Sequence, residues 1–425
     1  MAKHLGGNKW EVVENDTLPK IAAQAYGNSR HWPLIWRASN FRSDVPSLIY
    51  AGEIAICPDL PEWAEIIEPG GELSESIGQD EVSILIGPDL FTGWQGVTIN
   101  RSIDTCDDEF ALTSPFDPER KDFIRRLKPF GYQTCRLYLG NEMVLKGLVE
   151  KIEPVLTAED ITLTLQGRSL TGTLVDSCID SKATQFNKQT LKTIATWVCD
   201  LFGVGVEMPD GDTDRINETR VEPGQTAFDY LNQLAQGKGM LISSNGKGTL
   251  IIKRSNPNQK TVASIVEGES PLLGGMAAYD GTQRFSRYKV LLQADGNPSI
   301  FGVVEDMGVP INRPKIVRSN EIEGENRKDA ETAAAWRRTM ALAESVDLSV
   351  TISDWRTPEG ALWNKGVIVT LKAPSLMVYK ESPFTVAGVT LRIDEIKGRV
   401  ADLRLVLPET YTTDMPEAYP RDKCY

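Results

Sequence analysis

Histidine is the residue type that most restricts catalysis in this chain, because only His4 and His31 are present. Most of the 425 residues therefore lack a histidine general base, a Ser-His or Cys-His dyad and a histidine ligand for zinc. Pairs of carboxylates could still perform acid–base chemistry, but none of the 59 acidic residues stands out as part of such a pair. We therefore predict no catalytic residue, no cofactor and no bound metal.

The cysteines are spaced singly and form no CxxC pair. The six positions are Cys57, Cys106, Cys135, Cys178, Cys199 and Cys424. The first residues contain no apolar core of the kind that a secretory signal needs. We therefore expect reduced thiols in a chain that is made in the cytoplasm.

The charge balance argues against a protein whose main task is to bind nucleic acid or an anionic membrane. The chain has 46 basic and 59 acidic residues, a net charge of -13. Hydrophobic residues make up 41% and charged residues 25%, which is ordinary for a globular protein. No stretch approaches the roughly 18 apolar residues of a spanning helix. At about 150 residues per domain, the length predicts about three domains.

The first 58 residues predict a small unit with the order strand, helix, helix, strand. Trp10–Val13 is expected to be a strand, and a helix is expected after Asp16, whose carboxylate suits an N-cap. Gly27 is typical of the left-handed residue that ends a helix. Apolar spacing predicts a second helix at 32–40, and the run at 49–58 predicts a turn and a closing strand.

This βααβ unit resembles a LysM module. The matching residues are Val12, Asp16-Thr17-Leu18, Ile21-Ala22, Tyr26-Gly27, Trp32, Ile35, Asn40, Gly52 and Ile54-Ala55-Ile56-Cys57-Pro58. The glycine that usually precedes the Asp-Thr pair is Asn15 here. The resemblance implies binding to N-acetylglucosamine polymers such as peptidoglycan. A LysM module can equally serve as a packing unit within a larger assembly, and we favour that interpretation.

Any sugar contact in this unit would come from Asn15, Asp16, Thr17 and Tyr50, in the loops after the first strand and before the last. Tyr50 is the only aromatic residue there that could stack on a pyranose ring. Asp16 and Thr17 are equally explained as helix caps. We therefore expect weak or absent binding to chitin oligomers or peptidoglycan, and docking of the module against neighbouring proteins instead.

The rest of the chain predicts an α+β, multidomain protein. Residues 59–81 contain eight acidic residues and no basic one, which is typical of a linker that repels itself. From Val82 onward, several short alternating strands at close spacing predict a small barrel or sandwich, and residues 285–406 return to strands around one helix. Amphipathic helices and a hairpin predict an α/β insert at 181–279. Residues 408–425 lack periodicity and predict a C-terminal tail.

Some elements within these regions can be placed more closely. A helix is expected to start near Thr226, with Asp229 at the position that a capping box favours. Between residues 285 and 406 we expect a proline-rich connection at 298–314. Separate strands are expected at 383–389 and 389–397.

Four motifs carry a second resemblance, to the Mu-type phage baseplate hub, the tail protein of contractile phages. They are Gly93-Trp94-x-x-Val97-x-Ile99-x-Arg101-Ser102-Ile103, Gln166-Gly167-Arg168-Ser169-x-Thr171-x-x-Leu174-Val175-Asp176, Gln189-Thr190-Leu191-x-x-Ile194-Ala195 and Trp355-x-x-x-x-Gly360-x-Leu362-Trp363-x-x-Gly366-x-x-Val369. Their order and spacing extend the resemblance over roughly residues 80–425. Trp94, Trp355 and Trp363 are the large apolar residues of these motifs, and we expect them to be structural anchors.

The hub resemblance implies a non-enzymatic homotrimer. Each chain would carry a first small β-barrel at 82–180 and a second, with a helix insertion, at 280–407, separated by an α/β insert. Three chains would then form a ring with pseudo-sixfold symmetry. Such a ring joins a sixfold tail tube to a threefold spike. The implied partners are the spike protein, the tail tube or distal tube protein, the tape-measure protein and, through the LysM-like module, wedge proteins. No stable nucleic-acid binding is expected.

The implied location is the tail baseplate of a virion, after assembly in the cytoplasm of the bacterial host. The alternative function is a peptidoglycan-binding, tail-associated cell-wall hydrolase, because a LysM module often accompanies a lytic domain. The scarcity of histidine weakens that alternative. A free-standing cell-wall-binding protein is a third possibility, but it would need an export signal.

Overall fold

The computed structural model gives the fold of most of the chain. It describes residues 2–14, 16–27, 31–42, 49–59, 80–87, 89–119, 127–180, 185–292, 300–319, 327–394 and 396–411. The greater part of the predicted acidic linker, Asn15 and most of the predicted C-terminal tail lie outside these residues. No helix within the described ranges is long and apolar enough to cross a membrane.

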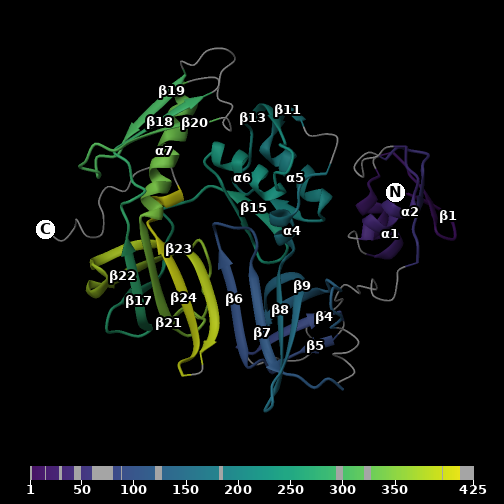
Figure 1. The fold of residues 1–425 in the computed structure, drawn as a ribbon, viewed down its shortest axis with the longest axis horizontal. Coiled ribbons are helices and arrows are strands. Elements are labelled where there is room, and N and C mark those ends of the chain that lie inside the picture. The colour runs from purple at the N-terminus through teal and green to yellow at the C-terminus, as the bar shows by residue number, and fades with distance from the viewer. Residues whose placement is uncertain are drawn as a thin grey trace.

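The N-terminal unit contains a three-stranded antiparallel sheet and two helices (Figure 1). Its elements are β1 (Lys3–Gly6), β2 (Lys9–Glu11), α1 (Leu18–Tyr26), α2 (Trp32–Ala38) and β3 (Ile54–Ile56). The strand β1 was not expected from the sequence. Leu18, Ile21 and Ile35 from the two helices are buried in one small core. The spacing of these apolar residues is therefore what fixes both helices on the sheet.

The cap of α1 differs from the sequence prediction by one residue. Thr17, not Asp16, is the N-cap, and its hydroxyl accepts a hydrogen bond from the backbone N–H of Lys20 at 3.4 Å. The Asp16 carboxylate instead accepts from the backbone N–H of Val13 at 2.9 Å and so closes the preceding turn. Gly27 ends the helix with φ 72°, in the left-handed region, as expected.

One 13-stranded sheet dominates the remainder of the chain. Its first half contains β4 (Val82–Ile86), β5 (Asp89–Phe91), β6 (Gly96–Ser102), β7 (Glu109–Pro115), β8 (Thr134–Leu139), β9 (Glu142–Leu156) and β10 (Ile161–Ser169). Its second half contains β16 (Thr261–Val266), β17 (Leu272–Tyr279), β21 (Val346–Ser353), β22 (Ile368–Ala373), β23 (Val378–Asp394) and β24 (Gly398–Val406). In Figure 1 the two halves lie side by side below the rest of the chain.

Antiparallel pairing of β6 with β23 joins the two halves, in a register that sets Asn100 opposite Thr390. The order runs β17-β21-β24-β23-β6-β7-β10-β9-β8-β4-β5, with β22 and β16 branching from β23. Among the described strands this order is open at both ends, so two closed barrels stay a prediction.

The longest strand, β23, corrects one expectation. We predicted separate strands at 383–389 and 389–397, whereas β23 runs unbroken through 17 residues. A register shift between Val386 and Gly388 absorbs the irregularity that suggested a break. Because β23 pairs with β22, β24 and β6, it is the strand that the two halves share.

Alternating burial explains why these strands stack into one core. In β6 the side chains of Val97 and Ile99 are buried, whereas Thr98 is partly exposed and Asn100 is exposed. In β21 the same period buries Leu348, Val350 and Ile352. Apolar residues of both halves belong to a single continuous cluster, so the core crosses the β6–β23 junction.

Between the two halves the chain forms a smaller α/β layer, here called the insert. Its elements are η2 (Leu170–Gly172), α4 (Thr173–Asp176), β11 (Gln185–Thr190), α5 (Leu191–Leu201), β12 (Gly205–Glu207), β13 (Arg215–Arg220), α6 (Ala227–Gly237), β14 (Leu241–Ser244) and β15 (Thr249–Lys253). Thr226 caps α6 by accepting from the backbone N–H of Asp229 at 3.1 Å, as the sequence predicts. Strands β16 and β17 fall within the range predicted for the insert, but they pair with the second half of the sheet.

The last unit consists of β18 (Arg287–Leu292), β19 (Phe301–Glu305), β20 (Pro314–Ser319) and α7 (Arg327–Glu344), and is here called the α7 unit. Strand β19 falls in the stretch for which a proline-rich connection was expected. Gly302 lets the strand approach the helix closely, since a Cβ there would lie 2.2 Å from the backbone of Ala330. Short helices η3 (Pro374–Leu376) and η4 (Pro408–Tyr411) complete the chain.

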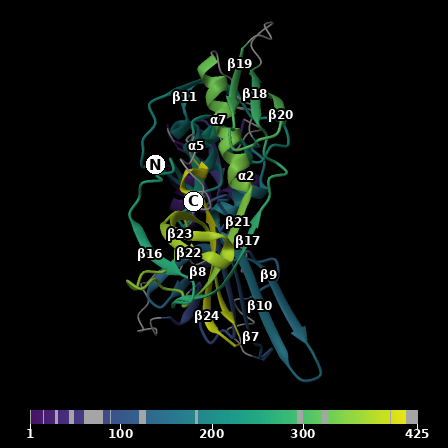
Figure 2. The same ribbon diagram turned by 90° about the vertical axis from the view of Figure 1, so that its left-hand side faces the viewer.

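A hairpin of β9 and β10 projects beyond the body of the molecule (Figure 2). The backbone N–H of Thr157 donates to the carbonyl of Asp160 at 2.9 Å and closes its turn. Val155 and Leu156, near this turn, are 44% and 78% exposed. Strand β10 of this hairpin also pairs with β7 from Thr162 to Arg168, which ties the hairpin to the sheet.

Candidate functional site

The β6–β23 junction contains a buried ionic group, here called the joint: Arg101 on β6, Asp108 just before β7 and Lys365 just before β22. The Lys365 ammonium lies 2.5 Å from one Asp108 carboxylate oxygen and donates to the backbone carbonyl of Ser102 at 2.9 Å. The Arg101 guanidinium lies 3.7 Å from the other carboxylate oxygen. The side chains of Asp108 and Lys365 are 0% and 5% exposed. The joint therefore connects the two halves of the sheet by charge as well as by strand pairing.

Burial sets the electrostatics of the joint. It lowers the pKa of Lys365 from its ordinary value of 10.5, while the Asp108 carboxylate acts in the opposite direction. Two cations share this one carboxylate, and a buried charge without a partner is strongly destabilising. The Asp108 carboxylate therefore compensates the buried charges of both Arg101 and Lys365.

The insert meets the first half of the sheet beside the joint. The turn between β14 and β15 holds Gly246 at φ 76°, and its carbonyl accepts from the backbone N–H of Lys146 at 2.6 Å. A Cβ on Gly246 would lie 2.4 Å from the carbonyl oxygen of Val144 and 3.4 Å from the Arg101 guanidinium. Only glycine fits this close approach of two backbones. Both halves of the sheet and the insert therefore converge on one place.

A second ionic contact fixes the start of the first half. Asp80, two residues before β4, accepts from Arg356 Nε at 2.9 Å and from Arg399 Nη1 at 3.0 Å. Both arginines belong to the second half of the sheet, and Arg356 also donates to the carbonyl of Gly360 at 3.0 Å. Charge-assisted bonds of this kind are stronger than neutral ones. These bonds fix the position of Asp80, where the predicted linker meets the sheet.

The three tryptophans expected as anchors lie in the core that spans both halves. Trp355 and Trp363 are fully buried, and Trp94 is 8% exposed. The indole N–H of Trp355 lies 3.1 Å from the carbonyls of Arg392 and Val400, so it is bound between β23 and β24. Burial of this kind is what the anchor prediction requires, although their role in an assembly stays a prediction.

The residues expected to contact sugar or a partner are only partly brought together. The backbone N–H of Gly52 donates to the carbonyl of Val12 at 2.8 Å, so the two loops lie side by side. Tyr50 is 50% exposed, and its backbone N–H donates to the Glu53 carboxylate at 2.6 Å. Asp16 and Thr17 bind backbone N–H groups at the start of α1. Asn15 lies outside the described residues.

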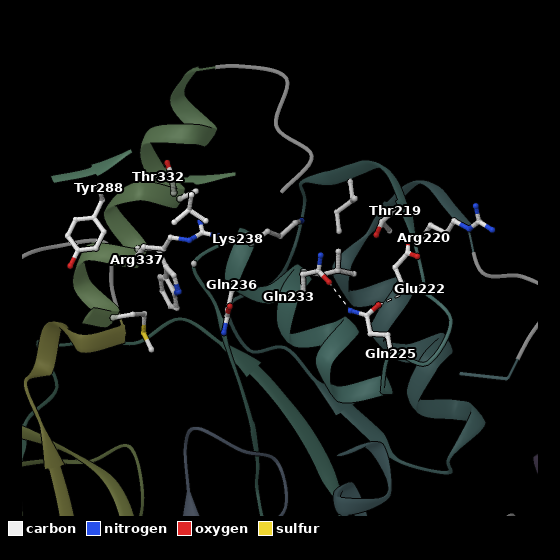
Figure 3. Close-up of a pocket in the computed structure, with 18 of the residues that line it drawn as sticks. Thr219, Arg220, Glu222, Gln225, Gln233, Gln236, Lys238, Tyr288, Thr332 and Arg337 are labelled. Carbon is white, nitrogen blue, oxygen red and sulfur yellow. Dashed lines mark hydrogen bonds between the residues drawn. The ribbon is translucent and has the colours of Figure 1, made fainter. Parts of the chain in front are cut away.

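A large groove separates the insert from the α7 unit (Figure 3). Its volume is about 1370 Å³, and it is lined by β13 and α6 on one side and by β18, β20 and α7 on the other. Glutamines line much of the insert side, where Gln225 donates to Gln233 at 2.8 Å. Sequence reasoning missed this groove because its walls come from separate parts of the chain. Within the described ranges, no group of three His, Cys, Asp or Glu side chains could hold a metal ion.

The five cysteines in the described part of the chain are free thiols, and four of them are buried. They are Cys57, Cys106, Cys135, Cys178 and Cys199, of which Cys178 is exposed. Burial raises the pKa of Cys57 to about 11 and raises that of Cys106 as well. These buried thiols are packing residues and not nucleophiles, since the thiolate is the reactive form.

Comparison with known proteins finds family matches for the first half of the sheet and for the insert. Residues 81–169 match the family described as Mu phage baseplate assembly protein GpP-like, N-terminal, and residues 171–254 match baseplate hub protein gp44-like, second domain. The chain is 27% identical over 324 residues to baseplate hub protein gp44 of Escherichia phage Mu, covering 73% of this chain and 83% of that protein. This chain is therefore similar to Mu-type baseplate hub proteins.

Solved structures show the same fold. The 43 kDa tail protein of prophage MuSo2 from Shewanella oneidensis is 28% identical, with a TM-score of 0.70 over 78% of this chain and 100% of that chain. The tail protein from Neisseria meningitidis MC58 is 20% identical, with a TM-score of 0.69 over 79% of this chain and 98% of that chain. The proteins that this chain resembles are baseplate hub and tail proteins and not enzymes, which argues against the cell-wall hydrolase considered above.

Proposed function

We propose that this hub protein forms a homotrimeric ring that joins a sixfold tail tube to a threefold spike. The observation that carries the proposal is the division of one continuous sheet into two halves, joined by β6 and β23. Three chains with two halves each present six repeating sheet elements around a threefold axis. One ring can then match a sixfold partner on one face and a threefold partner on the other.

The domain division that accompanies this proposal follows the sequence. Residues 1–58 form a LysM-like module, 59–81 a linker, and 82–180 and 280–407 two barrel-like units around an insert at 181–279. Strands β16 and β17 are the exception, because they complete the second unit. The joint supports this scheme, since it connects both units, and the contact of Gly246 with Lys146 holds the insert beside it.

The proposed partners are the spike protein, the tail tube or distal tube protein and the tape-measure protein, in the baseplate of a virion assembled in the host cytoplasm. The LysM-like module would meet wedge proteins. The groove between the insert and the α7 unit offers a large concave surface for one of these contacts.

The oligomeric state tests the ring directly. The chain has a mass of 47.0 kDa, so we expect a species of about 141 kDa, three times that value, in native mass spectrometry and in sedimentation of a concentrated sample. Ring contacts between obligate subunits bury on the order of 2,000 Å² or more, which is enough for a stable trimer. A protein that stays at 47.0 kDa at high concentration would contradict the proposal.

The LysM-like module is expected not to retain the full-length protein on insoluble peptidoglycan. Tyr50 is the only exposed aromatic residue of its two candidate loops, and one ring offers little stacking surface. A pull-down of the full chain measures this, with Tyr50→Ala as the matched variant. Strong retention that Tyr50→Ala abolishes would show that the module binds cell wall.

A further inference from the structure

The edge strand β17 lacks most of the features that usually protect a sheet edge. Its one irregularity is a register shift against β21 at its start, between Leu272 and Gly274, and from Gly274 to Tyr279 the pairing is regular. Strand β17 pairs with β21 on one side, and no described strand pairs with its other side. Its eight residues, LLGGMAAY, contain no charge and no proline. Soluble proteins normally shorten such edges, place charges on them, bend them with bulges or cover them. An eight-residue apolar edge is therefore expected to be covered in the assembled protein.

Apolar side chains gather along this edge. Leu273, Met276 and Tyr279 on β17 are 43%, 59% and 50% exposed. Met377 and Tyr379, which follow η3, are 51% and 46% exposed. These five residues are here called the β17 rim.

Two contacts show that the parts of the β17 rim are neighbours. The Tyr279 hydroxyl donates to the backbone carbonyl of Leu376 at 2.8 Å, which holds η3 on the strand. A Cβ on Gly275 would lie 2.9 Å from the Leu376 side chain, so glycine is needed for this packing. Met377 is held in the left-handed region, at φ 61°. The rim is therefore preformed, and a partner would lose little entropy in ordering it.

We propose that the β17 rim is a docking surface for a second copy of this chain, an inference that rests on the ring proposed above. The main path of the sheet ends at β17 and at β5, which lie on opposite sides of the sheet (Figure 1), while β16 is a third edge at the end of the side branch. In a cyclic assembly each copy offers one end to one neighbour and the other end to the next, in a head-to-tail contact. Strand addition at an apolar edge supplies backbone hydrogen bonds and buries the rim side chains in the same step.

A charge on this edge should prevent the contact. Met276→Lys places an ammonium on a side chain that is 59% exposed, so the folded monomer should tolerate it. The matched control is Ile316→Lys on β20, at a side chain that is 65% exposed and lies outside the rim. We expect the wild type and Ile316→Lys to sediment as trimers. Met276→Lys should be monomeric at the same concentration, with self-association at least 100-fold weaker.

Other results of this experiment would contradict either the docking inference alone or the ring as well. If the wild type is trimeric and Met276→Lys is equally trimeric, the docking inference is wrong while the ring stands. If the wild type is monomeric at every concentration, the ring itself is wrong, and the inference falls with it. Should Met276→Lys unfold, Met377→Lys replaces it, since Met377 lies outside any strand and is 51% exposed.

Amide hydrogen exchange gives an independent readout on the unmodified protein. Exchange at residues 272–279 should be slower in the concentrated trimer than in the dilute protein, because the free side of β17 gains hydrogen bonds. Residues 314–319 of β20 serve as the internal reference, and their exchange should not change. Equal exchange of 272–279 in both samples would overturn the inference.

Discussion

Replacing Asp108 by asparagine should lower the free energy of unfolding by about 3–5 kcal/mol, because the change removes the only carboxylate of the joint and leaves Lys365 buried. Arg101 would lose the same partner. Denaturant-induced unfolding of the protein measures the loss. If Asp108→Asn unfolds at the wild-type midpoint, the joint does not hold the two halves together.

The loss should depend on pH in a defined direction. The pKa of Lys365 is lowered in the folded chain, so the unfolded chain binds this proton more tightly. Stability therefore rises with pH between the lowered pKa and the ordinary value of 10.5, and asparagine at position 108 should widen this window. We expect the deficit of Asp108→Asn to be smaller near pH 10 than at pH 7.

Two variants serve as controls for this result. Arg327→Gln removes an exposed pair with Glu331, whose side chains are 79% and 44% exposed, and should change stability by about 0.5 kcal/mol or less. Asp108→Asn combined with Lys365→Met should recover much of the loss, because an apolar residue has no charge to desolvate. A double variant as unstable as Asp108→Asn alone would point to lost packing instead of an unpaired charge.

Trp363→Ala should lower the free energy of unfolding by about 3–5 kcal/mol, because this fully buried side chain fills the core that both halves share. Thermal and denaturant unfolding measure the effect, and the yield of soluble protein should fall with it. The control is Phe130→Ala, which truncates an aromatic side chain that is 89% exposed. Similar losses for the two variants would mean that Trp363 is not a core anchor.

The sequence predicted those strands, turns and helix caps that are determined by residues only a few positions apart in the chain. The alternating run in β6 and the hairpin of β14 and β15 form where the sequence places them, since side-chain period and turn residues act within a few positions. The cap at Thr226 was likewise predicted, because it needs only Asp229 three residues later. The N-cap of α1 was misassigned because Asp16 and Thr17 are both good caps, and the backbone path decides between them.

Features that depend on contacts between distant parts of the chain could not be predicted from the sequence. Lys365 and Asp108 are 257 positions apart, and neither residue type nor local spacing marks them as partners. Strand β17, with two glycines and two alanines, has little strand propensity of its own and forms because β21 provides its hydrogen bonds. The β17 rim and the groove follow from such pairings and were therefore missed.

The β6–β23 junction also has a consequence for biosynthesis. Asn100 and Thr390, which face each other across it, are 290 residues apart in the chain. At about 5–20 residues per second, β6 leaves the ribosome roughly 15–60 s before its partner strand is made. During that interval its pairing edge is open to other nascent chains, and such exposed edges are where aggregation begins. Slow translation or high expression without chaperones should therefore reduce the soluble yield of the whole hub protein.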